Sequence, residues 1–248
     1  MPQQLLVDRF FDTAIRTHNL FSSKNNLQFY LDYIFGNIDF TGRTMLDVGG
    51  GNGVFSFYAA CKGASRVVCL EPEADGSSSG VTRTFLEVRQ SLGLEDRVTQ
   101  LPLPLLDYNE ADCRFDIILL HNSINHLDEQ ACIDLLRSED ARHKYAAIFR
   151  RISSLMEPSG QLIIADCSRH NLFDSIGLKN PFVPQIEWEK HQSPSHWAAL
   201  LSETGFHPLG VRWSSFNSAR DVGKAFLGNW LGAYVSTSHF CLTAQKVA

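Results

Sequence analysis

MLDVGGGNG, residues 45–53, decides the fold of this chain. A short apolar run contains an acid, Asp47, and is followed by glycine at four of the five positions from 49 to 53. Glycines after a strand can hold a dinucleotide, cradle a phosphate, admit another cofactor or simply make a tight turn. The surrounding sequence has to decide among these four possibilities.

Strand and helix patterns alternate on either side of these glycines. The apolar runs 44–48 and 66–71 predict two strands, and the segment 54–62 between them predicts a helix that ends at Gly63. Further strands are predicted at 97–101, 115–120, 161–166, 208–213 and 239–247, and further helices at 81–93, 130–156 and 194–206. The long helix is expected to break near RSEDARHK, residues 137–144, and the turn residues PSG, 158–160, are expected to precede the fifth strand.

This alternation predicts an α/β fold with a Rossmann-like, doubly wound and mostly parallel sheet of seven strands. The last strand is expected to be antiparallel, because no helix pattern of the usual kind separates it from the sixth. Apolar residues at helical spacing before residue 40 predict an N-terminal helical cap, residues 1–40, ahead of a main domain at 41–248. Segments at about 169–191 and 214–236 fall outside the alternation and are predicted to be insertions.

Composition excludes several classes of protein. The formal net charge is −5 and there is no basic run, which argues against nucleic acid as a partner. The six cysteines are scattered singly, as expected of free thiols in a reducing compartment, and show no zinc-ligand spacing. Charged residues interrupt the N-terminal apolar runs, and no stretch reaches the roughly 18 apolar residues of a membrane span. We therefore expect a soluble, cytoplasmic protein that does not associate with a membrane.

The glycine spacing separates two cofactor classes. A dinucleotide fingerprint needs a third glycine at position 54, where Val54 stands. The pattern here is D-x-G-x-G-x-G, formed by Asp47, Gly49, Gly51 and Gly53. An acid two residues before the first glycine suits a cationic ligand group better than a pyrophosphate.

This pattern resembles the first motif of the class I S-adenosylmethionine-dependent methyltransferases. The resemblance extends from about Met45 to the end of the chain and includes HLD at 126–128, PSGQLIIAD at 158–166 and HWAALLSETGF at 196–206. It implies the seven-stranded fold, S-adenosylmethionine as cofactor and S-adenosylhomocysteine as product.

The resemblance also assigns cofactor-binding roles. It implies that the loop wraps the methionyl part through Gly49, Gly50, Gly51, Asn52 and Gly53, and that Asp47 holds the amino group through water. Glu71 would accept both ribose hydroxyls, although an NAD-binding acid has the same spacing. Leu103 and Pro104 occupy the expected place of the adenine-binding acid, so the adenine contact is assigned to Asp107 or to backbone. His121 and Asn122 fall where the family contacts the methionyl part and where substrate enters.

Histidines near strand ends are candidates for proton transfer. In-line methyl transfer succeeds largely by positioning, but some oxygen nucleophiles need a base with a pKa near the working pH. His121 and His170 are the predicted bases, with a structural imidazole as the alternative for each. His126 is expected to be structural and His191 to line an access loop. Asp166 and these histidines lack tight metal-ligand spacing, so no metal site is predicted.

The regions outside the shared core are rich in aromatic residues and predict an apolar or aromatic substrate under a lid, although many of these residues could simply cover the sheet. They are Phe10, Phe11, Phe21, Phe29, Tyr30, Phe173, Phe182, Trp188, Phe226, Trp230 and Tyr234. The prediction is methylation of a small, partly apolar metabolite, at oxygen first and otherwise at nitrogen or carbon. The Asn/Asp-Pro-Pro-Tyr/Phe signature is absent after the fourth strand, which argues against DNA or release-factor substrates. A cofactor-binding protein without transfer activity is the alternative from another class, and the sequence does not indicate an oligomeric state.

Overall fold

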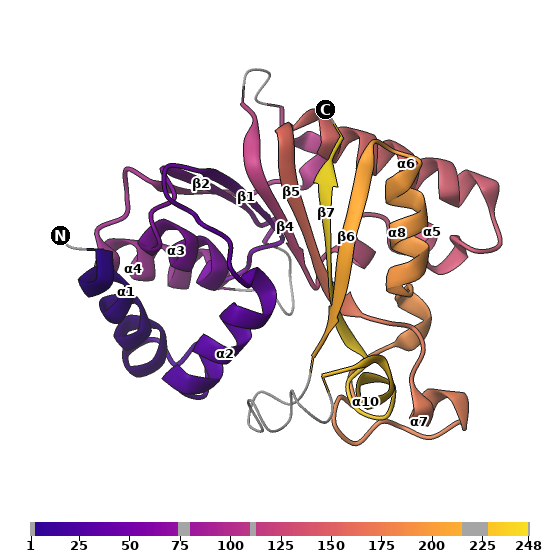
Figure 1. Ribbon diagram of the computed structural model, residues 1–248. Helices are drawn as coiled ribbons and strands as arrows, with labels where there is room; N and C mark the ends of the chain where they lie inside the picture. Colours follow the sequence, from indigo (N-terminus) through magenta and orange to yellow (C-terminus); the bar gives the residue numbers. More distant parts are fainter. Residues whose placement is uncertain (1–2, 74–79, 110–112, 215–227, 248) are drawn as a thin grey trace. The chain divides into compact units, whose positions relative to one another are not determined.

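The computed structural model describes residues 3–73, 80–109, 113–214 and 228–247. The chain divides into two compact units, residues 1–121 and 122–248 (Figure 1). Its seven strands follow the order β3-β2-β1-β4-β5-β7-β6, which confirms the predicted α/β fold with a mostly parallel sheet.

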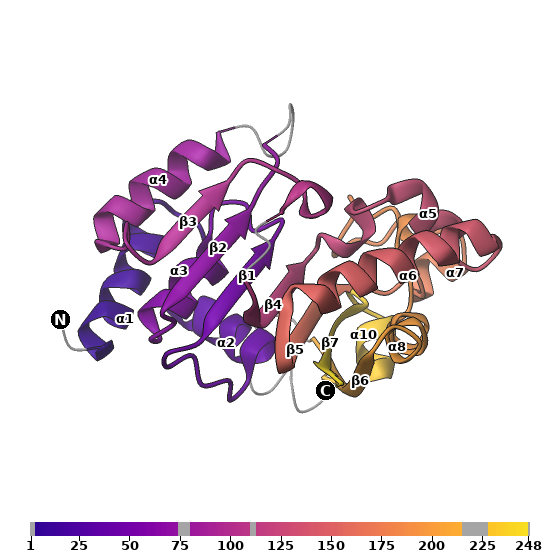
Figure 2. The ribbon, with the colours of Figure 1, turned by 90° about the horizontal axis from the view of Figure 1, so that it is seen from above.

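The first unit contains the glycine-rich stretch and four strands. Its elements are α1 (Gln3–Asp12), η1 (Thr13–Thr17), α2 (Lys24–Phe35), β1 (Thr44–Val48), α3 (Val54–Cys61), β2 (Arg66–Leu70), α4 (Val81–Leu92), β3 (Val98–Leu101), η2 (Leu105–Asp107) and β4 (Phe115–His121). Strand β1 pairs in parallel with β2 and β4, and β2 pairs in parallel with β3. Figure 2 shows β1, β2 and β3 side by side, with α4 next to β3.

Parallel pairing places the carboxyl ends of all four strands at one edge of the first unit. The strands are apolar through their middles because both faces are covered, and Met45, Leu46 and Ile117 have no exposed surface. Two helices precede β1 as predicted, and their apolar residues Phe10 and Phe11 belong to the core of this unit. Helix α1 packs on α3, where the ring of Phe10 contacts Tyr58, so these two buried rings are not available to line a substrate pocket.

The second unit contains the other three strands and most of the inserted sequence. Its elements are η3 (Ile124–His126), α5 (Glu129–Asp134), α6 (Glu139–Ser154), β5 (Met156–Cys167), α7 (Leu172–Ser175), η4 (Trp188–Lys190), α8 (Pro194–Ser202), β6 (Phe206–Trp213), α10 (Trp230–Tyr234) and β7 (His239–Lys246). Strand β7 pairs antiparallel with both β5 and β6, as expected for the last strand. Helix α8 lies against β6 and β7 (Figure 1).

Two local predictions in this unit have different outcomes. The break expected near residues 137–144 is confirmed, because α5 ends at Asp134 and α6 begins at Glu139 with the Ser138 side chain capping its first turn. The turn expected at residues 158–160 is wrong as a strand boundary, because β5 already begins at Met156. Ser159 adopts a positive φ of 62° within this strand, so the sharp bend is absorbed inside β5.

A buried hydrogen-bond network centred on Asn171 anchors the first predicted insertion. Asn171 Nδ2 donates to the carbonyls of Tyr234 and Ser236 and to Ser238 Oγ, while its Oδ1 accepts from Phe173 N and Asn180 Nδ2. Asn171 and Ser238 have no exposed surface. Because every polar atom of Asn171 is satisfied, this network fixes residues 171–182 against the segment that directly precedes β7.

The second predicted insertion, 214–236, is described only at its ends, and residues 215–227, which include Phe226, lie outside the described part of the chain. The end that is described forms α10, which Figure 1 shows at the same end of the second unit as α7. The side chains of Trp230 and Tyr234 stack on this helix, and Tyr234 Oη donates to Ser175 Oγ.

All six cysteines are free thiols, and all except the half-buried Cys113 are buried. Among the described residues, no helix has the length and apolar character needed to cross a membrane.

Candidate active site

The loop after β1 forms a backbone cradle that only glycine permits. The amide nitrogens of Gly49 and Gly50 both point at the carbonyl oxygen of Leu70, at 2.7 and 3.3 Å. A Cβ at Gly50 would lie 2.6 Å from Cys69 Sγ and 2.7 Å from Asp47 Oδ2, and one at Gly53 would lie 2.5 Å from the ring of Phe85. The loop therefore presses directly onto β2 at Gly50 and onto α4 at Gly53, and a side chain is excluded at these two positions.

Two side chains, one directly after β2 and one on β3, hold the centre of this loop. Glu71, directly after β2, accepts a hydrogen bond from the backbone N–H of Gly51 at 2.7 Å. Gln100, near the end of β3, donates from Nε2 to the carbonyl oxygen of Gly51 at 3.3 Å. Both backbone groups of Gly51 are thus held from β2 and β3, which lie on the same side of β1 in the sheet. The sequence pattern identified Glu71 but gave no signal for Gln100.

Asp47 is completely buried beneath the loop. Ser56 Oγ, from α3, donates to its Oδ2 at 2.7 Å, whereas its Oδ1 has no hydrogen-bond partner among the described residues. Burial raises the pKa of this carboxyl from its ordinary 3.8 to about 7, against the lowering effect of the Ser56 bond. An unsatisfied carboxylate oxygen under a glycine cradle is suited to receive a hydrogen-bond donor or a cation.

His121 is the last residue of β4 rather than the first residue after it. Its Nε2 lies 2.6 Å from the hydroxyl of Tyr30, which α2 supplies, and its ring packs against Phe55 with the centroids 4.5 Å apart. Tyr30 also stacks on Phe21 and Tyr33. The N-terminal helices therefore contribute a polar contact at the carboxyl edge of the sheet, which the sequence did not identify.

The remaining predicted site residues of the first unit are less enclosed. Asn52 is half-buried in the glycine loop. Asp107 lies in the short helix η2 after β3 and is exposed, and its carboxylate has no hydrogen bond or ion pair within the described ranges. The structure thus brings Asp47, Glu71 and the glycine loop into direct contact but leaves Asp107 apart from these contacts.

Asn122 belongs to the second unit and has a positive φ of 50°. Its backbone N–H donates to the carbonyl of Ala165, and its Oδ1 lies 3.1 Å from Nε2 of His239, at the start of β7. Burial lowers the pKa of His239 to about 4, so its ring is neutral near pH 7 and donates from Nε2 to Asn122. His239 was not among the histidines that the sequence singled out.

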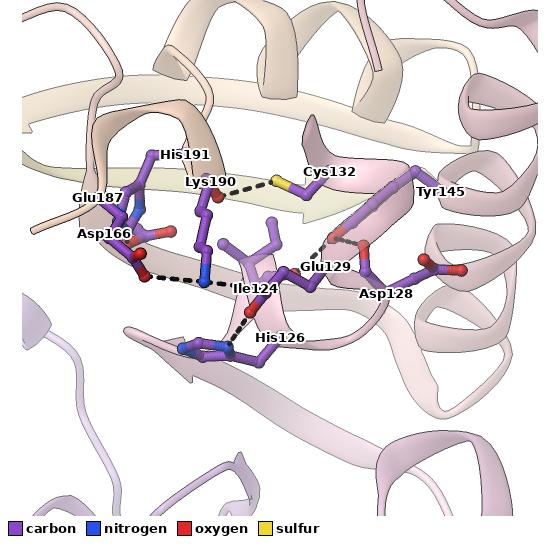
Figure 3. Close-up of polar contacts among 10 residues, drawn as sticks. All are labelled: Ile124, His126, Asp128, Glu129, Cys132, Tyr145, Asp166, Glu187, Lys190 and His191. Atoms are coloured by element: carbon purple, nitrogen blue, oxygen red, sulfur yellow. Dashed lines mark hydrogen bonds and ion pairs between the residues drawn. The ribbon is translucent and has the colours of Figure 1, made fainter. Parts of the chain in front are cut away.

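The other histidines of the second unit differ in their surroundings. His170 is exposed, and only its backbone makes hydrogen bonds in the part of the chain that is described. His126 lies 3.6 Å from Glu129 on the surface of the unit. His191 is buried, and its Nδ1 lies 3.1 Å from Oδ1 of Asp166 at the end of β5 (Figure 3). Of these three rings, only His191 has a buried carboxylate beside it.

No group of three or more His, Cys, Asp or Glu side chains with metal-binding geometry occurs among the described residues.

The model of the methyltransferase domain family matches residues 20–210 of the 248 residues. This range includes β1 with its glycine loop, strands β2 to β5 and the inserted segment that ends in His191.

Solved structures share the same fold. An S-adenosylmethionine-dependent methyltransferase from Mesorhizobium loti aligns with 84% of this chain and 93% of its own, at 15% identity and a TM-score of 0.56. The 1,6-didemethyltoxoflavin-N1-methyltransferase of Burkholderia thailandensis, with bound 1,6-didemethyltoxoflavin and S-adenosylhomocysteine, aligns over 99% and 88% at 15% identity and 0.53. The mitomycin 7-O-methyltransferase MmcR aligns over 100% and 61% at 17% identity and 0.55. At these identities the likeness concerns the fold.

Proposed function

The chain belongs to the methyltransferase domain family, and on that premise we propose that it transfers a methyl group from S-adenosylmethionine to an oxygen atom of a small, partly apolar metabolite. The observation that carries this proposal is the orphaned, fully buried Oδ1 of Asp47 beneath the glycine loop. S-adenosylmethionine supplies a methyl group on a positively charged sulfur.

The residues of the first unit fit this cofactor. Asp47 offers an unsatisfied carboxylate oxygen to a cationic amino group, and Gly50 leaves no space for a side chain between the loop and β2. Glu71 is assigned to the ribose, whose two hydroxyls would donate hydrogen bonds to its carboxylate. These bonds would replace the bond from the Gly51 N–H or be accepted beside it. We assign the methionyl part to the loop Gly49–Gly53, with His121 and Asn122 as further proposed contacts, and the adenine to Asp107 or nearby backbone.

In methyl transfer the protein acts mainly by orienting the acceptor and the methyl donor. The acceptor and the methyl carbon must be held in line and close together, and a fixed geometry supplies much of the rate. The Tyr30–His121 contact and the ring of Phe55 give the carboxyl edge of the first unit a rigid wall with one hydroxyl. We propose that this wall positions the acceptor, whereas His170, the other predicted base, is exposed and unsupported.

Oxygen is preferred over nitrogen because the chain places several histidines at strand ends, and a hydroxyl has to lose its proton during the transfer. Solved structures with this fold include the N1-methyltransferase and the 7-O-methyltransferase described above, so either acceptor is compatible with the fold. Methylation at nitrogen or carbon remains the alternative.

The function is tested by incubating the purified protein with S-adenosylmethionine labelled in the methyl group and a panel of small phenols, hydroxyquinolines, aromatic amines and hydroxy acids. The expected result is label transfer to a hydroxyl compound, with the new O-methyl group identified by mass spectrometry and NMR. An active-site control is Gly50→Ala, which the contacts of Gly50 predict to be inactive.

Three outcomes separate the alternatives. Transfer only to amines would replace oxygen by nitrogen as the acceptor. Cofactor binding without transfer to any acceptor would favour a cofactor-binding protein that has lost the reaction. Absence of cofactor binding would contradict the proposal altogether.

A further inference from the structure

The two ends of the first inserted segment line a cavity within the second unit. Its volume is about 400 Å³, in the range of about 300–1,000 Å³ that is usual for small-molecule sites. The lining residues are Arg169 and Asp174 from the start of the segment and Ile186, Glu187, Trp188 and Glu189 from its end. None of them belongs to the candidate active site described above, so the cavity needs an explanation of its own.

Both ends of the segment are fixed to the rest of the second unit. The hydrogen-bond network around the buried Asn171 holds the start of the segment. At its end, the carbonyl oxygen of Lys190 accepts from Cys132 Sγ at 3.3 Å (Figure 3), and Gln192 Nε2 donates to the carbonyl oxygen of Cys132 at 2.6 Å. The cavity is therefore preformed, and a ligand does not have to order its walls.

Arg169 brings a positive charge to the cavity that is not neutralised by its neighbours. Its side chain is half-buried, and its guanidinium makes no hydrogen bond or ion pair within the described part of the chain. Three carboxylates line the same cavity, yet none of them pairs with Arg169. A guanidinium is a planar fork of donors that matches a carboxylate, so this group is suited to an acidic group of a ligand.

The three carboxylates of the cavity differ in their partners. Glu187 pairs with the ammonium of Lys190 at 2.8 Å (Figure 3), whereas the exposed carboxylates of Asp174 and Glu189 make no ion pair among the described residues. A positively charged ligand group in the cavity would meet these two unpaired carboxylates. Acidic side chains by themselves would suit any cation, and Arg169 is the feature that restricts the choice to a ligand with both charges.

Trp188 adds an aromatic wall with an unused hydrogen-bond donor. The residue is only 7% exposed, and its indole N–H has no hydrogen-bond partner within the ranges that the structure describes. The N–H of a buried tryptophan usually has a partner, so this donor is available to an acceptor in the cavity. The half-buried Ile186 adds apolar surface. The cavity therefore also suits an apolar group on the ligand.

We propose that this cavity binds a free α-amino acid with an apolar side chain. Arg169 binds the carboxylate of the ligand, with the indole N–H of Trp188 as a further donor. Asp174 and Glu189 bind the ammonium group, and Ile186 packs against the side chain. A zwitterion satisfies both sets of charges at once, whereas a ligand with a single charge leaves one set unpaired. The assignment concerns binding within the second unit and does not depend on the proposed methyl transfer.

The first test compares matched ligands and needs no turnover. L-Leucine, L-phenylalanine and L-tryptophan are titrated calorimetrically into the full chain in the presence of excess S-adenosylhomocysteine, so that the proposed cofactor site does not contribute heat. Each amino acid is compared with its analogue without the carboxylate and its analogue without the ammonium group, for phenylalanine 2-phenylethylamine and 3-phenylpropionate.

At least one amino acid should bind, and each of its two analogues should bind at least about tenfold more weakly, because each loses a charge-assisted contact. Absence of binding by all three amino acids would overturn the proposal. An amine that binds as tightly as its amino acid would reduce the cavity to a cation site, and an equally tight acid would reduce it to an anion site. Either result would also overturn it.

The second test locates the ligand with the amino acid that binds most tightly. Arg169→Gln and Glu189→Gln should each raise its Kd by about tenfold or more, with the Tm of the free protein unchanged because neither side chain has an ion pair to lose. The exposed Arg150→Gln on α6 and Glu157→Gln on β5 are the matched controls. Wild-type affinity in Arg169→Gln, or a loss of affinity that always accompanies a lower Tm, would contradict the assignment.

A third measurement reports on the wall of the cavity itself. In 6-fluorotryptophan-labelled protein, the ¹⁹F signal of Trp188 is assigned from its absence in Trp188→Phe. Saturation with the amino acid should shift this signal, whereas the signal of the fully buried Trp197 on α8 should stay in place. An unmoved Trp188 signal would place the ligand elsewhere and overturn the proposal. A protein that binds the amino acid but transfers no methyl group would count against the proposed function alone.

Discussion

The carboxylate of Glu71 accepts the backbone N–H of Gly51 at 2.7 Å, so the acid after β2 and the centre of the glycine loop are bonded to each other. Gln100 holds the carbonyl of the same residue from β3, the strand next to β2. Loop and acid therefore act as one unit, and a ligand that engages Glu71 also affects the loop.

Replacement of Glu71 is expected to weaken cofactor binding and leave the fold intact. Hydrogen bonds to a charged group contribute about 1.5–3 kcal/mol, so Glu71→Ala should raise the Kd for S-adenosylhomocysteine by about tenfold or more. Isothermal titration calorimetry measures the affinity and circular dichroism the fold. The exposed Glu95→Ala serves as control, and wild-type affinity in Glu71→Ala would overturn the ribose assignment.

The glycines of the loop should differ in what they tolerate. Gly50→Ala places a Cβ against Cys69 and Asp47, so we expect loss of measurable cofactor binding and a lower Tm. Gly51→Ala meets no atom within 4 Å but adopts a φ of +53°, and its penalty should be limited to about 1–2 kcal/mol of backbone strain.

Gly42→Ala is the matched control for strain alone, because its φ is +72° and its Cβ also meets no neighbour within 4 Å. Differential scanning fluorimetry of the three variants separates contact from strain. Equal behaviour of Gly50→Ala and Gly42→Ala would show that the loop does not press on β2 as described.

The stability of the free protein should carry a pH dependence due to Asp47. Burial raises the pKa of this carboxyl in the folded state to about 7, above its ordinary 3.8, so the folded state binds more protons than the unfolded state between these values. The stabilising contribution of the proton on Asp47 is therefore complete below pH 3.8 and is lost as pH rises through about 7. Urea unfolding from pH 4 to 8 should show a steeper fall in stability for wild type than for Asp47→Asn, and parallel curves would count against it.

Cofactor binding should be coupled to the same proton. A cationic amino group near Asp47 favours the ionised carboxylate, so binding at pH 6 to 7 should release a proton. Calorimetry in two buffers of different ionisation enthalpy reports the number of protons released. Wild type should release protons at pH 6.5, whereas Asp47→Asn should show no buffer dependence from this group. Identical buffer dependence in the two proteins would contradict the role of Asp47.

The buried hydrogen-bond network around Asn171 should contribute to the stability of the second unit. Asn171→Ala removes an amide and leaves the carbonyls of Tyr234 and Ser236 without this donor, at a cost of about 1–3 kcal/mol for each unsatisfied group. Urea denaturation should show a free energy of unfolding lower by about 2–4 kcal/mol. Gln185→Ala, exposed in the same inserted segment, should change it by less than about 0.5 kcal/mol. Similar free energies of unfolding for both variants would show that the network does not stabilise the protein.

The sequence indicated the parts of the site that depend on local pattern. Asp47 and Glu71 were assigned from the resemblance of the glycine motif and of the acid after the second strand to a known family, and both residues lie beside the loop in the structure. The break between α5 and α6 was also local, because Ser138 is a recognisable N-cap.

Contacts between distant segments had no comparable signal. Tyr30 and His121 are 91 positions apart, and Gln100 and Gly51 are 49 apart. Such contacts depend on how helices and strands pack, which a periodic pattern does not encode. The strand boundary at Met156 was missed because Pro158, Ser159 and Gly160 favour a turn, whereas the structure accommodates them inside β5 with a positive φ at Ser159.

The most direct test of the central claim is calorimetric titration of the purified protein with S-adenosylmethionine and, separately, with NAD. The account predicts micromolar binding of S-adenosylmethionine with one site per chain and no heat with NAD. No binding of S-adenosylmethionine, confirmed by the absence of a thermal shift, would contradict it.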